Sequence, residues 1–176
     1  TVITSEANAL VKRWRQLAQN PRACKKAGLT LAEGEHLAQA ALAAGAEVRA
    51  VALRQDGASA EAVKLARAVC EALGAPLFVV ANPLYEAASP VERGAGVMLE
   101  IAVPQPGLPA SPVDADALYL DGVQDAGNAG TLIRTAVAAG VRWIAAAPAT
   151  AGLWSPKVMR AAVGAHFGAR IVEHVP

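Results

Sequence analysis

The stretch "DGVQDAGNAGTLIRTAVAAG", residues 121–140, decides the fold. It follows the apolar run ALYL and leads into a segment with helical periodicity, so we expect a strand, a glycine-rich turn and a helix ending at Ala139. Proteins of the α/β class often bind ligands at such strand-to-helix turns. Glycines let the backbone approach a ligand closely, and a helix start offers free N–H groups. The stretch therefore predicts an α/β fold with a ligand site at this turn, although an ordinary turn would use similar residues.

Two familiar phosphate-binding patterns are absent from this turn. The sequence contains no G-x-x-x-x-G-K-[ST], which excludes a nucleotide P-loop. It also lacks G-x-G-x-x-G, and Pro148 stands where a ribose-binding acid would be expected. A nucleotide-binding α/β module stays an alternative, but neither fingerprint supports it.

Arg134 lacks the acidic neighbours that usually pair with a helix arginine. The residues three and four positions away are Gly130, Thr131, Val137 and Ala138, and none is charged. Because side chains lean toward the start of their helix, we expect the guanidinium to reach back toward Asn128. An exposed, solvated arginine is the alternative interpretation.

Helix and strand patterns alternate through the first hundred residues. The apolar spacing predicts a helix over residues 10–18, with Thr4 or Ser5 as its cap and Trp14 on its buried face. Further strands and helices alternate as far as Val103, which predicts a mostly parallel sheet. Clear boundary signals mark two of the helices: Ser59 with Gly74, and Ser155 followed by Pro156.

A proline-rich linker divides the chain. Residues 104–116, "PQPGLPASPVDAD", contain four prolines and no apolar periodicity. We therefore expect one domain over residues 1–103 and another over residues 117–176. The second part, about 60 residues long, is small for an independent α/β domain and looks unfinished.

Composition indicates a globular protein. The residues are 54% hydrophobic and 18% charged, which suits a chain with a substantial core. No apolar run reaches the roughly 18 residues of a membrane span, and no signal peptide is recognisable. Cys24 and Cys70 show neither disulfide nor metal spacing, which favours the cytoplasm. Because the sequence begins at Thr1, we expect a processed or partial chain.

Positive charge gathers at both ends of the chain. Residues 1–28 hold six basic side chains against one acidic, residues 29–127 hold five against thirteen, and residues 128–176 hold five against one. A polyanion could contact both ends, although a solvated basic helix face explains either end alone. The basic residues of the first segment are Lys12, Arg13, Arg15, Arg22, Lys25 and Lys26.

The opening stretch resembles the first motif of the SpoU/TrmH branch of SPOUT RNA methyltransferases. "SPKVMRAAVGAHFG", residues 155–168, resembles the second motif at Lys157, Arg160, Gly164 and Ala165. "PRACKKAGLTLAEGEHLAQAAL", from Pro21, is similar to the start of the family's small RNA-binding domain. The resemblance implies an L30e-like α/β RNA-binding domain followed by a SPOUT domain, an α/β knot with a parallel sheet.

Two features depart from the family pattern. Ala162 stands where serine is frequent, and the third motif, a Gly-Glu turn followed by a Ser-Leu-Asn segment, is absent. In the family that motif completes the knot and supplies most of the S-adenosylmethionine pocket. We therefore expect an incomplete SPOUT domain with no assignable cofactor residues. The uncovered faces predict an altered or domain-swapped assembly, or a disordered end.

The resemblance implies methylation of a ribose 2′-hydroxyl in tRNA or rRNA, with S-adenosylmethionine as the donor and no metal. It assigns Arg134 to the hydroxyl, and Asn128 would position Arg134 or the ribose. A guanidinium stays protonated, so we expect Arg134 to hold a phosphate and orient the 2′-oxygen. Further RNA phosphates would contact seven cations: Arg13, Arg15, Arg22, Lys25, Lys26, Lys157 and Arg160.

The remaining expectations concern the histidines, two tryptophans, the oligomeric state and an alternative function. We assign no chemistry to His36, His166 or His174, and we interpret Trp143 and Trp154 as packing or dimer contacts. The family implies a homodimer formed through the catalytic domain. A non-catalytic RNA-binding protein of the same fold is the alternative function.

Overall fold

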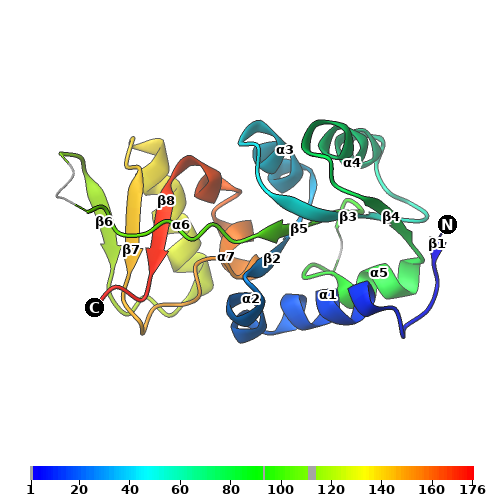
Figure 1. Cartoon of the computed structure of the whole chain (residues 1–176), viewed down its shortest axis with the longest axis horizontal. Coiled ribbons are helices and arrows are strands. Elements are labelled where there is room, and N and C mark those ends of the chain that lie inside the picture. The colour runs from blue at the N-terminus through cyan, green and yellow to red at the C-terminus, as the bar shows by residue number, and fades with distance from the viewer. Residues whose placement is uncertain (1, 93, 111–113) are drawn as a thin grey trace.

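A computed structural model describes residues 2–92, 94–110 and 114–176. Figure 1 shows two sheets side by side, with α7 between them. The helices are α1 (Ala9–Gln19), α2 (Pro21–Ala27), α3 (Glu35–Ala43), α4 (Ala60–Leu73), α5 (Asn82–Ala88), α6 (Ala126–Ala138), α7 (Pro156–Ala161) and the 3₁₀ helix η1 (Ala165–Gly168). The strands are β1 (Val2–Ile3), β2 (Leu29–Glu33), β3 (Val48–Arg54), β4 (Leu77–Val80), β5 (Val97–Ala102), β6 (Ala117–Leu120), β7 (Trp143–Ala146) and β8 (Arg170–Glu173).

The N-terminal sheet is mixed rather than mostly parallel. Its strand order is β1-β4-β3-β5-β2. The β1–β4 and β3–β4 pairs are parallel, whereas β5 runs antiparallel to both β3 and β2. The prediction of a mostly parallel sheet was therefore wrong for β5. A continuous apolar run shows that a strand is buried but not in which direction it runs.

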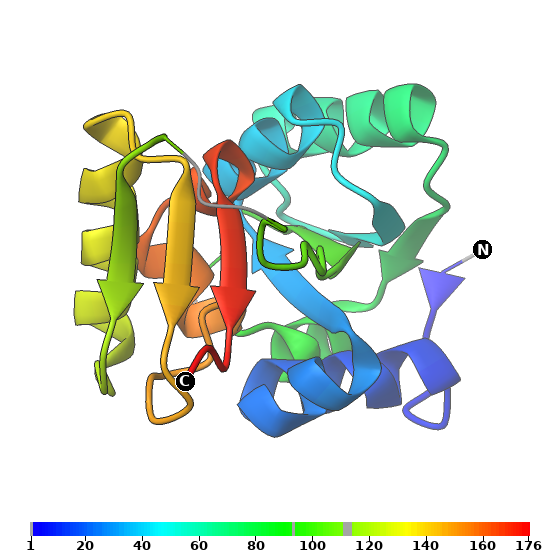
Figure 2. The same ribbon diagram turned by 60° about the vertical axis from the view of Figure 1, so that its left-hand side comes forward.

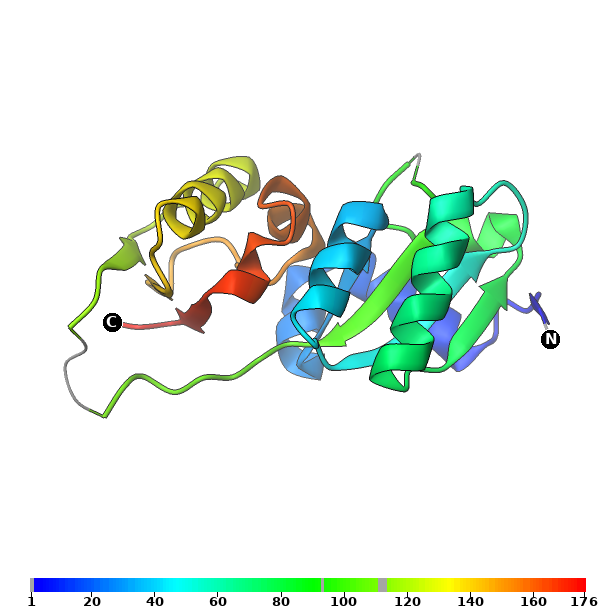
Figure 3. The same ribbon diagram turned by 90° about the horizontal axis from the view of Figure 1, so that it is seen from above.

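The C-terminal sheet is parallel throughout the described residues. Its order is β6-β7-β8, with Leu118 opposite Ile144 and Ile144 opposite Ile171. Figures 2 and 3 show α6 and α7 on one face of this sheet, while the chain that follows β5 crosses the other. That crossing segment is the first part of the predicted 104–116 linker, and residues 111–113 lie outside the described residues.

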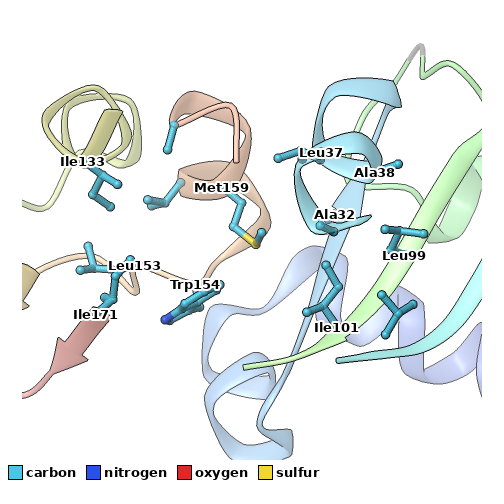
Figure 4. Packing of buried hydrophobic residues seen from close by; sticks show 14 of the residues in the cluster. Ala32, Leu37, Ala38, Leu99, Ile101, Ile133, Leu153, Trp154, Met159 and Ile171 are labelled. Carbon is cyan, nitrogen blue, oxygen red and sulfur yellow. The ribbon is translucent and has the colours of Figure 1, made fainter. Parts of the chain in front are cut away.

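One hydrophobic core runs through both sheets. Its buried residues include Ala32, Leu37 and Ile101 from the N-terminal part and Trp154 and Met159 from the C-terminal part. Figure 4 shows these side chains meeting between α7 and the β2–α3 segment. The division into two domains stays a proposal, since the two parts share this core.

Two further contacts join the parts at short range. Buried Thr30 donates a hydrogen bond from Oγ1 to the carbonyl of Trp154 over 2.5 Å. A Cβ added to Gly164, whose φ is 77°, would lie 2.8 Å from the Ala40 Cβ on α3. Gly164 is therefore needed both for its backbone conformation and for the close approach of the C-terminal part to α3.

The capping residues predicted from the sequence are confirmed for two helices. The predicted cap of the first helix was wrong. Ser59 and Ser155 cap α4 and α7 as predicted. However, α1 is capped by Asn8, whose side chain accepts from the Leu10 N–H at 2.9 Å, and not by Thr4 or Ser5. Asn8 is the residue immediately before the helix and has the short polar side chain that a cap requires.

Within the described part of the chain, no helix has the length and apolarity to cross a membrane.

Candidate functional site

The glycine-rich turn is closed by its own aspartate. Asp125 caps α6, and its Oδ1 accepts a hydrogen bond from the backbone N–H of Asn128 at 2.7 Å. The expected free N–H groups at this helix start are therefore partly occupied. The carboxylate also makes the helix start less suited to an anion than a bare helix N-terminus would be.

Gly130 serves the packing of two helices. A Cβ at this position would lie 2.4 Å from the Ala161 Cβ and 2.8 Å from the Val158 carbonyl oxygen. Such distances leave no room for any side chain. The glycine therefore lets α6 lie directly against α7, and this contact brings the residues of the two sequence motifs onto neighbouring helices.

Arg134 and Asn128 are both exposed on α6. Among the described residues, Arg134 takes part in no ion pair and no side-chain hydrogen bond, and it does not bond to Asn128. The reach of the guanidinium back toward the Asn128 turn stays a prediction. The guanidinium is left free for an external acceptor.

On α7, the two predicted cations lie beside a buried face. Lys157 and Arg160 are exposed, whereas Val158 and Met159 are fully buried. Ala162, at the position where the family often has serine, is also buried and its backbone N lies 2.8 Å from where a Gly130 Cβ would be.

A buried acid, Glu33, was missed by sequence reasoning. It ends β2 with 7% of its surface exposed, and its carboxylate accepts hydrogen bonds from Ser89 and, at 3.2 Å, from Tyr85. Burial raises the pKa of Glu33, and the positive charges of Arg54 and Arg160 partly oppose that rise. Burial and the Glu33 charge together raise the pKa of Tyr85. The available signal was an acid at the end of an apolar strand, directly before a glycine.

Some of the N-terminal cations form ion pairs with acidic side chains, whereas others are exposed to solvent. Arg13 donates to both oxygens of buried Glu100, from Nε at 2.8 Å and from Nη2 at 2.7 Å. Trp14 donates its indole N–H to the same carboxylate at 2.9 Å, and Arg15 lies 3.7 Å from Glu6. RNA contact by Arg13 stays a prediction, but it would compete with this bidentate pair. The cations of α2, by contrast, are exposed: Arg22, Lys25 and Lys26.

Two cavities lie between the parts. One, of about 420 Å³, is lined by α2, by the segment after β5 and by the carboxyl ends of β7 and β8. The other, of about 290 Å³, lies near Trp154 and His166. Neither is lined by Asn128 or Arg134.

His166 is a structural residue. It is fully buried, and its Nε2 lies 2.7 Å from the Leu153 carbonyl oxygen, to which it donates. Burial lowers the pKa of His166 to about 4. Across the described residues, no three histidine, cysteine or acidic side chains gather closely enough to hold a metal ion.

Two known protein families match this chain over most of its length. The profile of the SpoU rRNA Methylase family matches residues 116–175, and that of the MRM3-like substrate binding domain matches residues 8–98. The chain belongs to the SpoU rRNA methylase family. Asn128, Arg134, Lys157 and Arg160 lie within the methylase match, and Glu33 lies within the substrate-binding match.

Three similar proteins of this family cover most of the chain. The Bacillus subtilis 23S rRNA (guanosine(2553)-2′-O)-methyltransferase RlmP is 28% identical over 97% of this chain and 64% of its own length. An uncharacterised tRNA/rRNA methyltransferase from Synechocystis is 34% identical over 92% of this chain and 58% of its own. The crystal structure of the SpoU methyltransferase AviRb from Streptomyces viridochromogenes, in complex with the cofactor AdoMet, superposes with a TM-score of 0.78 at 25% identity, covering 96% of this chain and 63% of AviRb. The chain thus spans less than two thirds of each relative.

Proposed function

We propose that the protein containing this chain transfers a methyl group from S-adenosylmethionine to a ribose 2′-hydroxyl of rRNA or tRNA. The observation that carries the proposal is the contact of α6 with α7 at Gly130. Arg134, which is exposed and has no side-chain partner among the described residues, lies on the helix that adjoins the one carrying Lys157 and Arg160. The similar protein RlmP is a 2′-O-methyltransferase of 23S rRNA, which supports the same chemistry.

Arg134 would hold the RNA beside the reacting oxygen. Its guanidinium stays protonated, so it suits a phosphate better than it suits the role of a base. By donating paired hydrogen bonds to a phosphate, it would orient the neighbouring ribose. Asn128, exposed two turns earlier on α6, would position the ribose or Arg134.

Sequence-independent phosphate contacts would come from two surfaces. Lys157 and Arg160 would supply them from α7, and Arg22, Lys25 and Lys26 from α2. Arg13 and Arg15 already face Glu100 and Glu6, so their proposed contribution is smaller.

The methyl donor in this proposal is S-adenosylmethionine, whose sulfonium activates the methyl group without a metal. AviRb was crystallised with this cofactor. Neither cavity described above is lined by Asn128 or Arg134, the residues proposed to meet the ribose. We therefore assign no residue of this chain to the cofactor.

We further propose a homodimer working in the cytoplasm. Exposed Leu132 and Val163, on α6 and just after α7, are apolar residues available for a contact between subunits. The free thiols Cys24 and Cys70 suit a reducing compartment. Light scattering would give the mass of the assembly, and a monomer would contradict the dimer.

Methyl transfer to RNA tests the function itself. The full-length gene product is incubated with methyl-labelled S-adenosylmethionine and rRNA or tRNA, and the labelled nucleotide is mapped. We expect one ribose to become resistant to alkaline cleavage, and replacing that nucleotide by its 2′-deoxy form to abolish labelling. Tight RNA binding without labelling would instead identify a non-catalytic RNA-binding protein.

A further inference from the structure

The larger cavity lies where four segments of the chain meet. Its walls come from α2, from residues 103–106 after β5, from the segment between β7 and α7, and from β8 with His174. The carboxyl ends of parallel strands are a common place for ligands, and a volume of about 420 Å³ is within the range of small-molecule sites. Asn128 and Arg134 do not line it, but it adjoins the turn before α6, because Ala151, between the wall residues Thr150 and Gly152, donates its N–H to the Val123 carbonyl.

The cavity combines positive charge with a carboxylate. Arg22 and Lys25 line it from α2, and both are exposed. Glu173 lines it from the end of β8, with one oxygen, Oε1, accepting the Leu153 N–H at 2.6 Å. The other carboxylate oxygen has no hydrogen bond from a described residue and can accept one from a ligand. The site thus offers cations for a phosphate and an acceptor for an N–H group.

The apolar wall contains an unsatisfied donor. Trp154 is 5% exposed, and its indole Nε1 is buried without an acceptor among the described residues. Figure 4 shows this nitrogen on the side of Trp154 that faces Ile171, a second wall residue. A buried donor without a partner is unfavourable, so an acceptor bound beside Trp154 would relieve that cost once the indole turned toward it.

We propose that this cavity binds a single nucleotide of the RNA. The phosphate would contact Arg22 and Lys25, and the base would lie between the apolar wall and Glu173. A nucleobase carries both acceptors and N–H donors, so it can meet the Trp154 indole and the Glu173 carboxylate together. The inference rests on the proposed function, because it takes the partner to be RNA, and it adds a second contact point to the methyl-transfer site.

A lysine outside the proposed RNA-binding surfaces supplies a matched control. Lys25 lines the cavity, whereas Lys64 on α4 does not, although both are exposed. Calorimetric titration with each of the four ribonucleoside 5′-monophosphates, and with inorganic phosphate, is carried out on the wild-type, K25A, K64A and E173Q proteins. We expect at least one nucleotide to bind, K25A to weaken its binding about 5-fold or more, and K64A to change it less than about 2-fold. E173Q, which keeps an acceptor for Leu153 but gains an amide, should change the order of preference among the four bases.

Several results would overturn the proposal. Failure of all four nucleotides to bind at millimolar concentration would do so. Equal weakening by K25A and K64A, or phosphate binding as tightly as any nucleotide, would indicate surface charge alone. Because the titration needs neither S-adenosylmethionine nor methyl transfer, its failure is distinguishable from a failure of the proposed activity.

Discussion

One residue of the second motif has a strained backbone. Val163, three residues after Arg160, has a φ of 52° and lies exposed between α7 and Gly164. A β-branched residue is strained in this left-handed conformation, by about 1–2 kcal/mol. The strain sits next to cations proposed to contact RNA, which is where proteins commonly keep such residues.

Relieving that strain should stabilise the protein. We expect V163N to raise the free energy of unfolding by about 1 kcal/mol, because asparagine tolerates a positive φ. Urea unfolding of the wild-type, V163N and V163A proteins measures this change in the free energy of unfolding. The alanine variant, which removes the exposed branches but keeps a side chain unsuited to positive φ, should gain less. A loss of stability in V163N would show that Val163 makes a contact worth more than the strain.

The sequence identified individual motif residues but not the ion-pair and hydrogen-bond partners of the charged side chains. Arg134 was predicted to lack a helical partner, and none is present among the described residues. The Arg13–Glu100 pair joins residues 87 positions apart, so no local pattern could reveal it. Glu33 was missed for the same reason, since its partners Tyr85 and Ser89 lie on another element.

At the scale of elements, the α6–α7 contact depends on one glycine. Adding a methyl at Gly130 would place it 2.4 Å from Ala161, so the helices must separate. We expect G130A to lower the free energy of unfolding by about 2 kcal/mol, the usual cost of overpacking. G127A, on the same helix, meets only Asp125 at 3.1 Å and should change stability by less than about 1 kcal/mol. Equal effects of the two variants in urea unfolding would refute the assignment of Gly130 to helix packing.

Element types were largely predictable, whereas glycine roles were not. The spacing of apolar residues and the Ser59 and Ser155 caps located most helices, because these signals are local. Glycines in the opening stretch were expected to face a ligand. Whether a glycine faces a ligand or a neighbouring helix depends on tertiary packing, which the sequence of one segment does not encode.

The segment holding His166 should make the protein sensitive to acid. The pKa of His166 is about 4 in the folded state against an ordinary value of 6.5. Because the folded pKa is the lower one, the neutral ring stabilises the fold above about pH 6.5, and this stabilisation is lost as the pH falls toward 4. The shift corresponds to about 3 kcal/mol.

A non-titrating variant isolates this effect. We expect H166Q to be less stable than wild type near neutral pH but to lose about 3 kcal/mol less on acidification from about pH 7 to pH 4. Urea unfolding at a series of pH values measures both proteins. Parallel pH profiles for the two would mean that His166 does not cause the acid sensitivity.

At the scale of the whole molecule, the two parts should unfold together. Their shared core includes Leu37 and Ile101 from one side and Trp154 and Met159 from the other. We expect a single calorimetric transition with equal calorimetric and van't Hoff enthalpies. Two resolved transitions, or a van't Hoff enthalpy well below the calorimetric one, would show two independently folding domains. The proline-rich linker suggested such independence, but a linker's composition says nothing about whether the parts it joins also pack together.

Arg134 is central to the whole account, so methyl transfer by its variants is the most direct measurement. Single-turnover transfer to RNA is compared for the full-length wild-type, R134A and R142A proteins. Arg142 is a matched control, because it is also exposed but donates to the Val137 carbonyl of its own chain at 2.9 Å. We predict that R134A loses about 100-fold or more in rate while R142A stays within about 3-fold of wild type. Near-normal 2′-O-methylation by R134A would contradict the account.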